Sequence, residues 1–102
     1  MRIDGFDWDF GNRVKCQKHG VSVDEIEALF RSPRLLVLPD LKHSRDEERL
    51  KAIGRSNAGR WIAMIFTMRK KDGLALVRPV TVRYMHAKEV AQYEEAIPDL
   101  DV

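Results

Sequence analysis

A long hairpin pattern between Gly59 and His86 constrains the fold of this 102-residue chain more than any other feature. Two segments rich in Val, Ile, Leu, Met and aromatic residues flank the sequence Lys-Lys-Asp-Gly at residues 70–73. A tight polar turn whose glycine can adopt a positive φ, placed between two such segments, is typical of a β-hairpin. Asp72 is the one acid of this stretch, against the cations Arg60, Arg69, Lys70, Lys71, Arg78 and Arg83. Hypotheses about function therefore start from a basic hairpin.

Length and composition narrow the class of protein. A chain of 102 residues is of ordinary size for one domain and buries roughly 60–70% of its unfolded surface, so we expect residues 1–102 to form a single domain. No hydrophobic segment approaches the roughly 20 residues that span a bilayer, and the acids of MRIDGFDWDF do not fit a signal peptide. Cys16 is the one cysteine, which excludes an intrachain disulfide and a cysteine cluster for zinc. We expect a cytoplasmic protein without a membrane segment.

Two helices are expected before the hairpin. Asp9 ends a short strand or extended lead-in and suits the N-cap of a helix over residues 10–19, which Gly20 would close. Residues 22–25, Ser-Val-Asp-Glu, have the spacing of a capping box and predict the start of a second helix. That helix should stop near the Ser-Pro pair at residues 32–33, because a residue before proline is disfavoured in the α region.

The remaining elements complete an α+β pattern. Residues 35–38 and 49–55 are expected to be strands, and residues 87–97 a third helix with His86 in the cap position and Glu89 at N3. The order is helix, helix, three or four antiparallel strands, and helix. We therefore predict an α+β fold with one small sheet and helices largely on one of its faces. The other face or one end of such a sheet stays free to bind a ligand.

The length of the hairpin turn decides which residue lies opposite Arg83. A turn of three residues is expected to place Trp61 there, and a turn of two or four residues Arg60. Arg69 and Arg83 lie roughly eight residues apart along the sheet, about 26 Å at the usual rise per residue. We expect them not to share one catalytic centre unless the sheet is strongly bent, whereas an extended ligand could contact both.

Motifs along nearly the whole chain resemble those of the BrnT toxin family. In order and with similar spacings they are Trp8-Asp9, Lys18-His19-Gly20-Val21-Ser22, Glu47-Glu48-Arg49, Ile53-Gly54-Arg55-Ser56, Phe66-Thr67, Arg83-Tyr84-Met85-His86, Lys88-Glu89 and Tyr93-Glu94. The resemblance implies a RelE-like fold and a metal-independent endoribonuclease that halts translation in bacteria. It also implies a type II toxin–antitoxin operon. The expected partner is a BrnA-like antitoxin, which neutralises the toxin by direct contact in a 2:2 assembly and carries the operator-binding domain.

Cleavage of RNA by its 2′-hydroxyl needs a base, a proton source for the 5′-oxygen and positive charge for the phosphorane. A guanidinium suits the last role because it presents paired donors to phosphate oxygens and stays charged. Arg83 is the first choice for this catalytic role. Arg69 is the second choice, because it corresponds to an arginine that follows the Phe-Thr strand in the family pattern. His86 could act as acid or base, or could cap the last helix, where many family members have Thr. Glu47 and Glu48 could supply a base, although such an acid pair is more often a solvated face.

Other cations are candidates for binding the RNA backbone. The net charge is only +2, so affinity for nucleic acid must come from the layout of the charges. Arg60 and Lys70 belong to the basic hairpin. Lys18 and His19 could contact phosphate, or could simply stabilise the C-terminal end of the first helix through its dipole. Lys88 lies in the first turn of the last helix, against the dipole preference, which hints at a ligand.

Several well-known site motifs are absent from the sequence. It contains no glycine-rich phosphate loop, no Cys or His cluster and no Gly-x-Ser-x-Gly elbow, so we expect no metal and no other cofactor. The alternative to a ribonuclease is a non-catalytic module, a degenerate toxin that binds RNA or protein with the same basic sheet face. The last helix departs from the arginine-rich helix of many family members, since it has Ala87, Val90, Ala91 and Gln92 instead.

Overall fold

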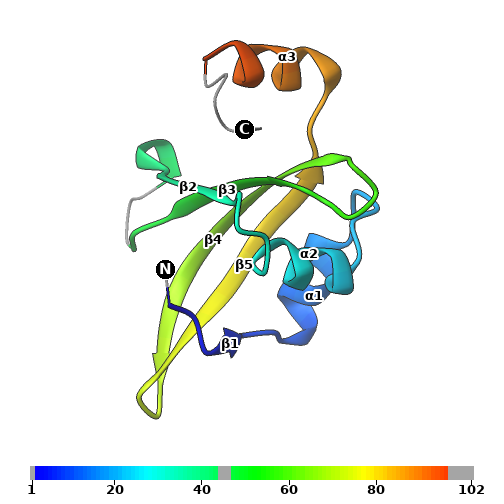
Figure 1. The fold of residues 1–102 in the computed structure, drawn as a ribbon. Coiled ribbons are helices and arrows are strands. Elements are labelled where there is room, and N and C mark those ends of the chain that lie inside the picture. The colour runs from blue at the N-terminus through cyan, green and yellow to red at the C-terminus, as the bar shows by residue number, and fades with distance from the viewer. Residues whose placement is uncertain (1, 44–46, 97–102) are drawn as a thin grey trace.

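The structure is a computed structural model that describes residues 2–43 and 47–96. Within these residues the chain forms three α-helices and one mixed five-stranded sheet (Figure 1). In chain order the elements are β1 (Gly5–Phe6), α1 (Phe10–Cys16), α2 (Val23–Leu29), β2 (Leu36–Pro39), the 3-10 turn η1 (Leu41–His43), β3 (Leu50–Arg55), β4 (Trp61–Lys71), β5 (Leu74–Tyr84) and α3 (Ala87–Ala96). The predicted α+β class is confirmed.

The central hairpin forms as the sequence predicts. β4 and β5 pair antiparallel, and Lys71 lies opposite Leu74 across a two-residue turn. Asp72 and Gly73 both have positive φ, 52° and 79°. Two successive residues with positive φ are typical of a type I′ turn, whose twist matches that of the flanking strands. The Asp-Gly pair therefore sets both the place and the tightness of the hairpin.

The register of the hairpin differs from both expected alternatives. Arg83 pairs with Ala63, and not with Trp61 or Arg60. Two features set the observed register. Because Asp72 and Gly73 form the turn, Lys71 pairs with Leu74, and a count from that pair alone places Ile62 opposite Arg83. An irregularity between Ile65 and Phe66, whose partners on β5 are Thr81 and Pro79, then makes Val80 an extra residue. Such a bulge shifts all pairing beyond it by one residue. A count from the turn alone therefore places Arg83 wrongly.

A fifth strand corrects the expected sheet of three or four antiparallel strands. β1 pairs parallel with β5 at one edge, and the strand order is β1-β5-β4-β3-β2. Backbone N–H groups of Asp4 and Asp7 donate to the carbonyls of Ala75 and Val77, each at 2.8 Å. A strand of two residues is too short to show an alternating pattern in the sequence. β1 is defined as a strand by its pairing with the long strand β5.

The helix caps agree with the sequence, whereas the first two helices are shorter than expected. Ser22 Oγ accepts from the Glu25 N–H at 3.1 Å, as the predicted capping box requires. Asp9 caps α1, and Asn12 completes a second capping box that the sequence analysis did not identify. α1 ends at Cys16, residues 17–19 form turns, and Gly20 has a φ of 92°. α3 begins where predicted, and the expected end at residue 97 lies outside the described residues.

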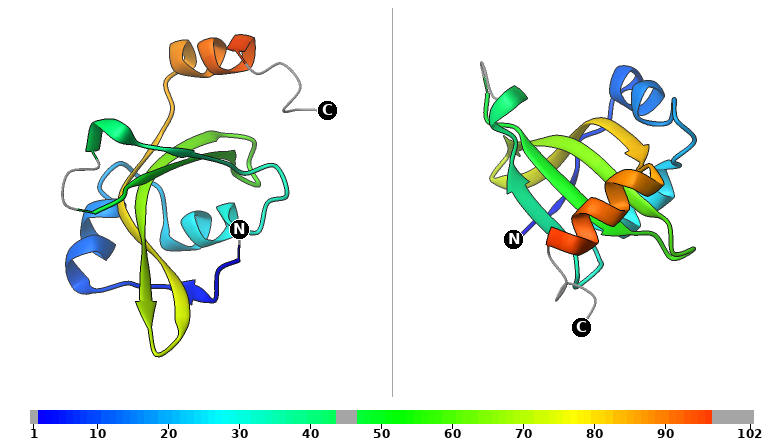
Figure 2. Two further views of the ribbon diagram at one scale, coloured as in Figure 1. Left: turned by 90° about the vertical axis from the view of Figure 1, so that its left-hand side faces the viewer. Right: turned by 90° about the horizontal axis from the view of Figure 1, so that it is seen from above.

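The two faces of the sheet carry different layers. On one face, α2 covers a core in which the Phe30 ring packs edge-on against Phe66 at 5.2 Å and Phe6 at 5.6 Å. α3 lies on the opposite side of the sheet from α2 (Figure 2), where Tyr93 packs against Trp61 at 5.5 Å. The expectation that the helices lie largely on one face is therefore wrong for α3.

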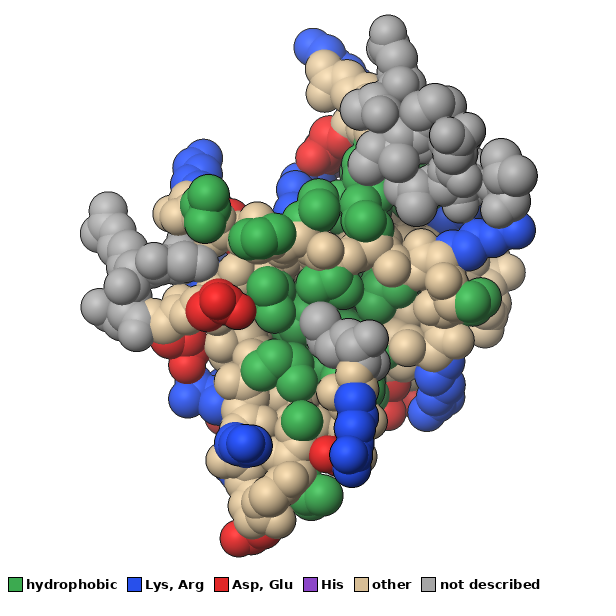
Figure 3. Space-filling model, turned by 60° about the vertical axis from the view of Figure 1, so that its left-hand side comes forward, with side chains coloured by type: hydrophobic (Ala, Val, Ile, Leu, Met, Phe, Trp, Pro, Cys, Tyr) green, Lys and Arg blue, Asp and Glu red, His purple; other side chains and the backbone are tan. Residues whose placement is uncertain are grey.

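The surface mixes apolar and basic areas. On the face shown in Figure 3, hydrophobic side chains gather in the centre, and Lys and Arg side chains lie around them. Ile3, Leu35, Val37 and Leu50 are among the partly buried side chains that pack at the margin of the core. Within the described part of the chain, no helix is long and apolar enough to cross a lipid bilayer.

Candidate functional site

Two adjoining hollows lie on the sheet face opposite α2. The first, of about 430 Å³, is lined by Asp9, Gly11, Asn12, Lys15, Glu47, Arg49, Thr67, Arg69, Arg78, Pro79 and Val80. The second, of about 400 Å³, is lined by Lys15, Arg49, Lys51, Ala63, Met64, Ile65, Val80, Thr81 and Arg83. Lys15, Arg49 and Val80 line both hollows. We call these two adjoining hollows together the basic groove.

Strand alternation and the bulge explain why these side chains share one face. Side chains two residues apart on a strand point the same way, so Thr67 and Arg69 of β4 lie on one face. Arg78 and Arg83 of β5 are separated by an odd number of residues, and regular alternation would send them to opposite faces. The extra residue Val80 between them restores the match: Arg78 pairs with Thr67, and Arg83 pairs with Ala63 of the same face. The bulge therefore brings both arginines to the groove.

Cations outnumber acids along the basic groove. The positively charged side chains that line it come from α1, from β3 and its N-terminal flank, and from β4 and β5. They are Lys15, Arg49, Lys51, Arg69, Arg78 and Arg83. Among the described residues, the acids that line the groove are Asp9 and Glu47. A concave surface with such an excess of one sign concentrates its field and favours an anionic ligand.

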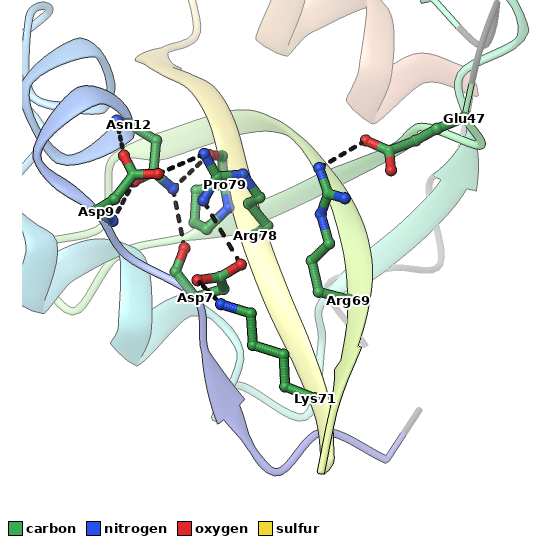
Figure 4. A network of polar contacts seen from close by, with 8 residues as sticks. All are labelled: Asp7, Asp9, Asn12, Glu47, Arg69, Lys71, Arg78 and Pro79. Carbon is green, nitrogen blue, oxygen red and sulfur yellow. Dashed lines mark hydrogen bonds and ion pairs between the residues drawn. The ribbon is translucent and has the colours of Figure 1, made fainter. Parts of the chain in front are cut away.

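Arg78 is held by two carboxylates at one end of the groove (Figure 4). Its Nη2 lies 2.7 Å from Asp9 Oδ2, and its Nη1 lies 3.5 Å from Asp7 Oδ2. Lys71 Nζ also contacts Asp7, at 3.2 Å. The hydrogen bond to Asp9 raises the pKa of Arg78. The backbone N–H of Asn12, followed by Arg78, lowers the pKa of Asp9.

Asn12 joins α1 to the strand beside the bulge. Its side chain is buried, and its Nδ2 donates to the carbonyl of Asp7 and to the carbonyl of Pro79, each at 3.0 Å. Its Oδ1 accepts from the Asp9 N–H at 2.7 Å. One amide therefore satisfies three backbone groups and places the start of α1 against β5, where Lys15 can line the groove.

Arg69 and Glu47 form an exposed pair in the first hollow. Arg69 Nη2 lies 3.3 Å from Glu47 Oε1, and the two side chains are 43% and 36% exposed. Thr67 Oγ1 donates to the Glu48 carbonyl at 2.9 Å. This bond fastens the residue after Glu47 to β4, so the carboxylate is presented at the groove rather than on a free loop.

Arg83 is held by a carboxylate from α3. Its Nη1 and Nη2 donate to Glu89 Oε1 and Oε2, each at 2.7 Å. The His86 backbone N–H donates to the same carboxylate at 3.1 Å, which confirms Glu89 as the N3 partner of the predicted cap. Chiefly through Arg83, these bonds lower the pKa of Glu89 to about 2. A bidentate pair of this kind fixes the plane of the guanidinium.

Several residues expected at the site line neither hollow. Lys18 and His19 are exposed in the turn after α1. Lys88 is exposed in the first turn of α3. His86 is exposed, and its carbonyl accepts the first helical bond of α3 from Val90, so it occupies the N-cap position.

The remaining two expected residues belong to the other face of the hairpin or to its end. Arg60 stacks on the ring of Tyr84 at 3.5 Å, and the Tyr84 hydroxyl donates to Glu25 of α2 at 2.8 Å. Lys70 is exposed and follows Arg69 on β4, so alternation turns it away from the groove. Of the expected catalytic and RNA-binding residues, Arg69 and Arg83 are the two that line the groove.

Sequence reasoning missed four cations of the groove as site residues: Lys15, Arg49, Lys51 and Arg78. Lys51 is two residues from Arg49, a spacing that predicts a shared strand face. Arg78 was visible as part of the basic hairpin, but the bulge that aligns it with Arg83 has no sequence signal. Lys15 reaches the groove only because α1 packs on β5.

A third hollow, of about 590 Å³, lies between α2 and the β3–β4 turn. Its charged lining residues have both signs, with Asp24 and Glu25 beside Arg31 and Arg55. This balance gives it no preference for a ligand of either charge.

Neither the Cys16 thiol nor the possible metal ligands among the described residues form a second reactive site. Burial raises the pKa of the Cys16 thiol to about 11, so the thiol stays protonated at neutral pH and is a poor nucleophile. Over residues 2–43 and 47–96, no three side chains of His, Cys, Asp or Glu come together in a way that could hold a metal ion.

Comparison with known proteins identifies the family. No curated protein matches the chain. A family model, described as the ribonuclease toxin BrnT of type II toxin–antitoxin systems, matches residues 8–89. This match spans α1 to the first turn of α3 and includes every lining residue of the basic groove. The chain therefore belongs to the BrnT family of ribonuclease toxins of type II toxin–antitoxin systems.

Proposed function

We propose that this protein is a metal-independent endoribonuclease that binds RNA along the basic groove, cleaves it there, and so inhibits translation and growth. The observation that carries the proposal is that two adjoining hollows share three lining residues and together have six lining cations. A positively charged groove that follows a phosphate backbone is a common way to bind a single strand. The groove joins Arg69 and Arg78 at one end to Arg83 at the other.

Arg83 is proposed to stabilise the phosphorane. A guanidinium has five N–H donors, of which Glu89 takes two and the Tyr84 carbonyl a weak third at 3.5 Å. Donors therefore remain for a phosphate oxygen in the groove. Glu89 is proposed as a positioning residue, since it holds the guanidinium plane without touching RNA. Arg69 is proposed to supply positive charge at the other end.

The expected site residues that do not line the basic groove are assigned roles outside it or none. His86 is proposed to act as the cap of α3 rather than as an acid or base, because it occupies the N-cap position and does not line the groove. Lys18, His19 and Lys88 are proposed to contact RNA that extends beyond the groove. Arg60 and Lys70 are not included in the proposed RNA path.

The test compares the wild type with Arg83→Ala during induced expression in a bacterial host. We expect growth arrest and new RNA 5′ ends with the wild type, and neither with the variant. Purified wild type should cleave RNA equally well with and without EDTA, and Arg83→Ala should lower the cleavage rate by about 10²-fold or more, as expected when a donor to transition-state charge is lost. Arg13→Ala, an exposed α1 arginine outside the groove, is the matched control.

Two results would contradict this assignment in different ways. Wild-type cleavage by a folded Arg83→Ala protein would remove Arg83 from the mechanism. Intact RNA and normal growth with folded wild type would favour a second function, a non-catalytic module that binds RNA or protein through the same face. The carboxylate pairing of Arg69, Arg78 and Arg83 supports that second candidate, because it reduces the charge each arginine offers to a phosphate.

Membership of a type II toxin–antitoxin family implies a protein antitoxin as partner. We propose that this partner is a BrnA-like antitoxin, that the complex contains two copies of each chain, and that operator DNA is contacted through the antitoxin. The cytoplasm, where RNA and ribosomes are found, is the proposed location. Light scattering of the co-expressed complex tests the stoichiometry, because a 1:1 complex would have half the expected mass.

A further inference from the structure

We propose that Glu47 is the general base of RNA cleavage, the group that takes the proton from the attacking 2′-hydroxyl. The inference rests on the proposed function and chooses between Glu47 and Glu48, which the sequence left open as a possible base or as a solvated acid pair. It is carried by the place of Glu47 in the first hollow, where Lys15, Arg49, Arg69 and Arg78 also line the wall.

The carboxylate of Glu47 is accessible and has room to accept a proton. The side chain is 36% exposed, and its Oε1 lies 3.3 Å from Arg69 Nη2. An ionised carboxylate has two oxygens with about four acceptor positions, so a bond to Arg69 leaves acceptor capacity for a substrate hydroxyl. The adjacent guanidinium would lie beside the phosphate at which negative charge develops.

The backbone that follows Glu47 holds it in this place. The Glu48 carbonyl accepts from Thr67 Oγ1 at 2.9 Å, and the Arg49 carbonyl accepts from the Asp40 N–H at 2.9 Å. Both partners belong to or adjoin strands of the sheet. A general base must be held within hydrogen-bond reach of the proton that it removes, and these bonds anchor the segment for that purpose.

The neighbouring acids are committed to other bonds. Asp9 accepts from the Asn12 N–H at 2.9 Å and pairs with Arg78 at 2.7 Å. Glu89 forms two bonds of 2.7 Å with Arg83, which lower its pKa to about 2 and make it a weak base. Asp7 contacts both Lys71 and Arg78. Of the acids lining the groove, Glu47 is the one whose carboxylate is not also a helix cap.

The proposed step balances without any further reactant. Glu47 accepts the proton of the 2′-hydroxyl as the O2′–P bond forms. The P–O5′ bond breaks, its electron pair goes to O5′, and that oxygen takes a proton from solvent. The products are a 2′,3′-cyclic phosphate and a 5′-hydroxyl end. Arg83 remains the residue proposed to stabilise the phosphorane, and Arg69 and Arg78 add positive charge on the side of Glu47.

The test compares Glu47→Gln with Glu48→Gln in single-turnover cleavage of 5′-labelled oligoribonucleotides by purified protein. We expect Glu47→Gln to lower the cleavage rate by about 10²–10⁴-fold, the usual size of general base catalysis, while Glu48→Gln matches the wild type. Binding of the corresponding 2′-deoxy oligonucleotide, measured by fluorescence anisotropy, should stay equal or become slightly tighter, because a negative charge is removed. Glu47→Asp should retain part of the rate.

A pH profile separates a base from a merely structural group. The wild-type rate should rise with pH on the acidic side of the profile, and this rise should be absent from the residual activity of Glu47→Gln. Equal rates for the wild type and Glu47→Gln would overturn the role of Glu47 alone. Absence of cleavage by the wild type, with the 2′-deoxy strand still bound, would instead overturn the proposed function and this inference with it.

Discussion

At the scale of single residues, Glu89 shows how one side chain serves both stability and the site. It accepts from Arg83 twice and from the His86 backbone once. The bonds hold the start of α3 against the end of β5 and at the same time orient the arginine that lines the groove. Both effects depend on the carboxylate being ionised.

The pH dependence of stability should therefore carry a signature of Glu89. Its pKa falls from an ordinary 4.5 to about 2 in the folded protein. A lowered pKa means that the carboxylate contributes stability above pH 4.5 and loses it as the pH falls towards 2. We expect Glu89→Gln to reduce the free energy of unfolding by about 1 kcal/mol or less at pH 7, since the pair is partly exposed.

Urea unfolding of the wild type and Glu89→Gln at several pH values measures this contribution. The difference between the two proteins should be largest above pH 4.5 and should disappear only as the pH falls below about 2. A difference that stays constant over this range would show that the ion pair with Arg83 is not its source.

At the scale of elements, α1 depends on a buried amide more than on its own length. α1 has seven residues, too few for a stable isolated helix. Asn12 supplies half of its capping box and bonds to the Asp7 and Pro79 carbonyls. Loss of these bonds would leave buried carbonyl groups unpaired and loosen the wall of the groove that carries Lys15.

We expect Asn12→Ala to lower the free energy of unfolding by about 2–3 kcal/mol, because unpaired buried acceptors and a lost cap each carry a cost. Gln17→Ala is the matched control, since it removes an exposed side-chain bond to Arg13 at the other end of α1. That change should stay within about 0.5 kcal/mol. Urea unfolding compares the two variants, and equal losses would show that Asn12 contributes no more than a surface contact.

At the scale of the whole molecule, a net charge of only +2 conceals a strongly asymmetric surface. Six cations from four parts of the chain line one groove, and acids elsewhere balance them. The slope of log affinity for RNA against log salt concentration should therefore reflect the number of groove cations that contact phosphates, and not the net charge of the protein.

Salt titration of binding to a 2′-deoxy oligonucleotide tests this distribution. Lys51→Ala should reduce the slope of log affinity against log salt by about 0.7, the contribution of one phosphate contact on a single strand. Arg13→Ala removes the same charge from α1 outside the groove and should leave the slope unchanged. Equal slopes for all three proteins would mean that Lys51 does not face the strand.

Comparison of the sequence with the structure separates local signals from distant ones. The sequence Lys-Lys-Asp-Gly at residues 70–73 predicted the hairpin turn, Ser22 and Glu25 predicted a helix start, and Glu89 was recognised as the N3 partner of His86. Each of these signals acts over three or four residues, so the residues that form the contact are also neighbours in the sequence. For the same reason, the α+β class and the basic character of the hairpin followed from local patterns.

The candidate site followed from the sequence only in part. Arg69 and Arg83 were expected and line the groove, whereas Lys15, Arg49, Lys51 and Arg78 join them through the packing of separate elements. The expected register was wrong because the sequence left the length and position of the turn open, and because nothing in the sequence around Val80 indicates a bulge. A short strand or extended lead-in before Asp9 was expected, but its pattern is too short to show that β1 pairs in parallel with β5.

The sequence by itself determined the places of the turns and caps, the class of the fold, the set of charges and the resemblance to a toxin family that the family match confirms. Tertiary structure alone decided that Arg78 and Arg83 share a face, that α3 brings Glu89 to Arg83, and that Glu47 reaches the groove beside Arg69. The physical reason is the distance along the sequence between the residues that interact. Caps and turns are satisfied within a few residues, whereas a groove forms only after strands and helices distant in the chain have packed together.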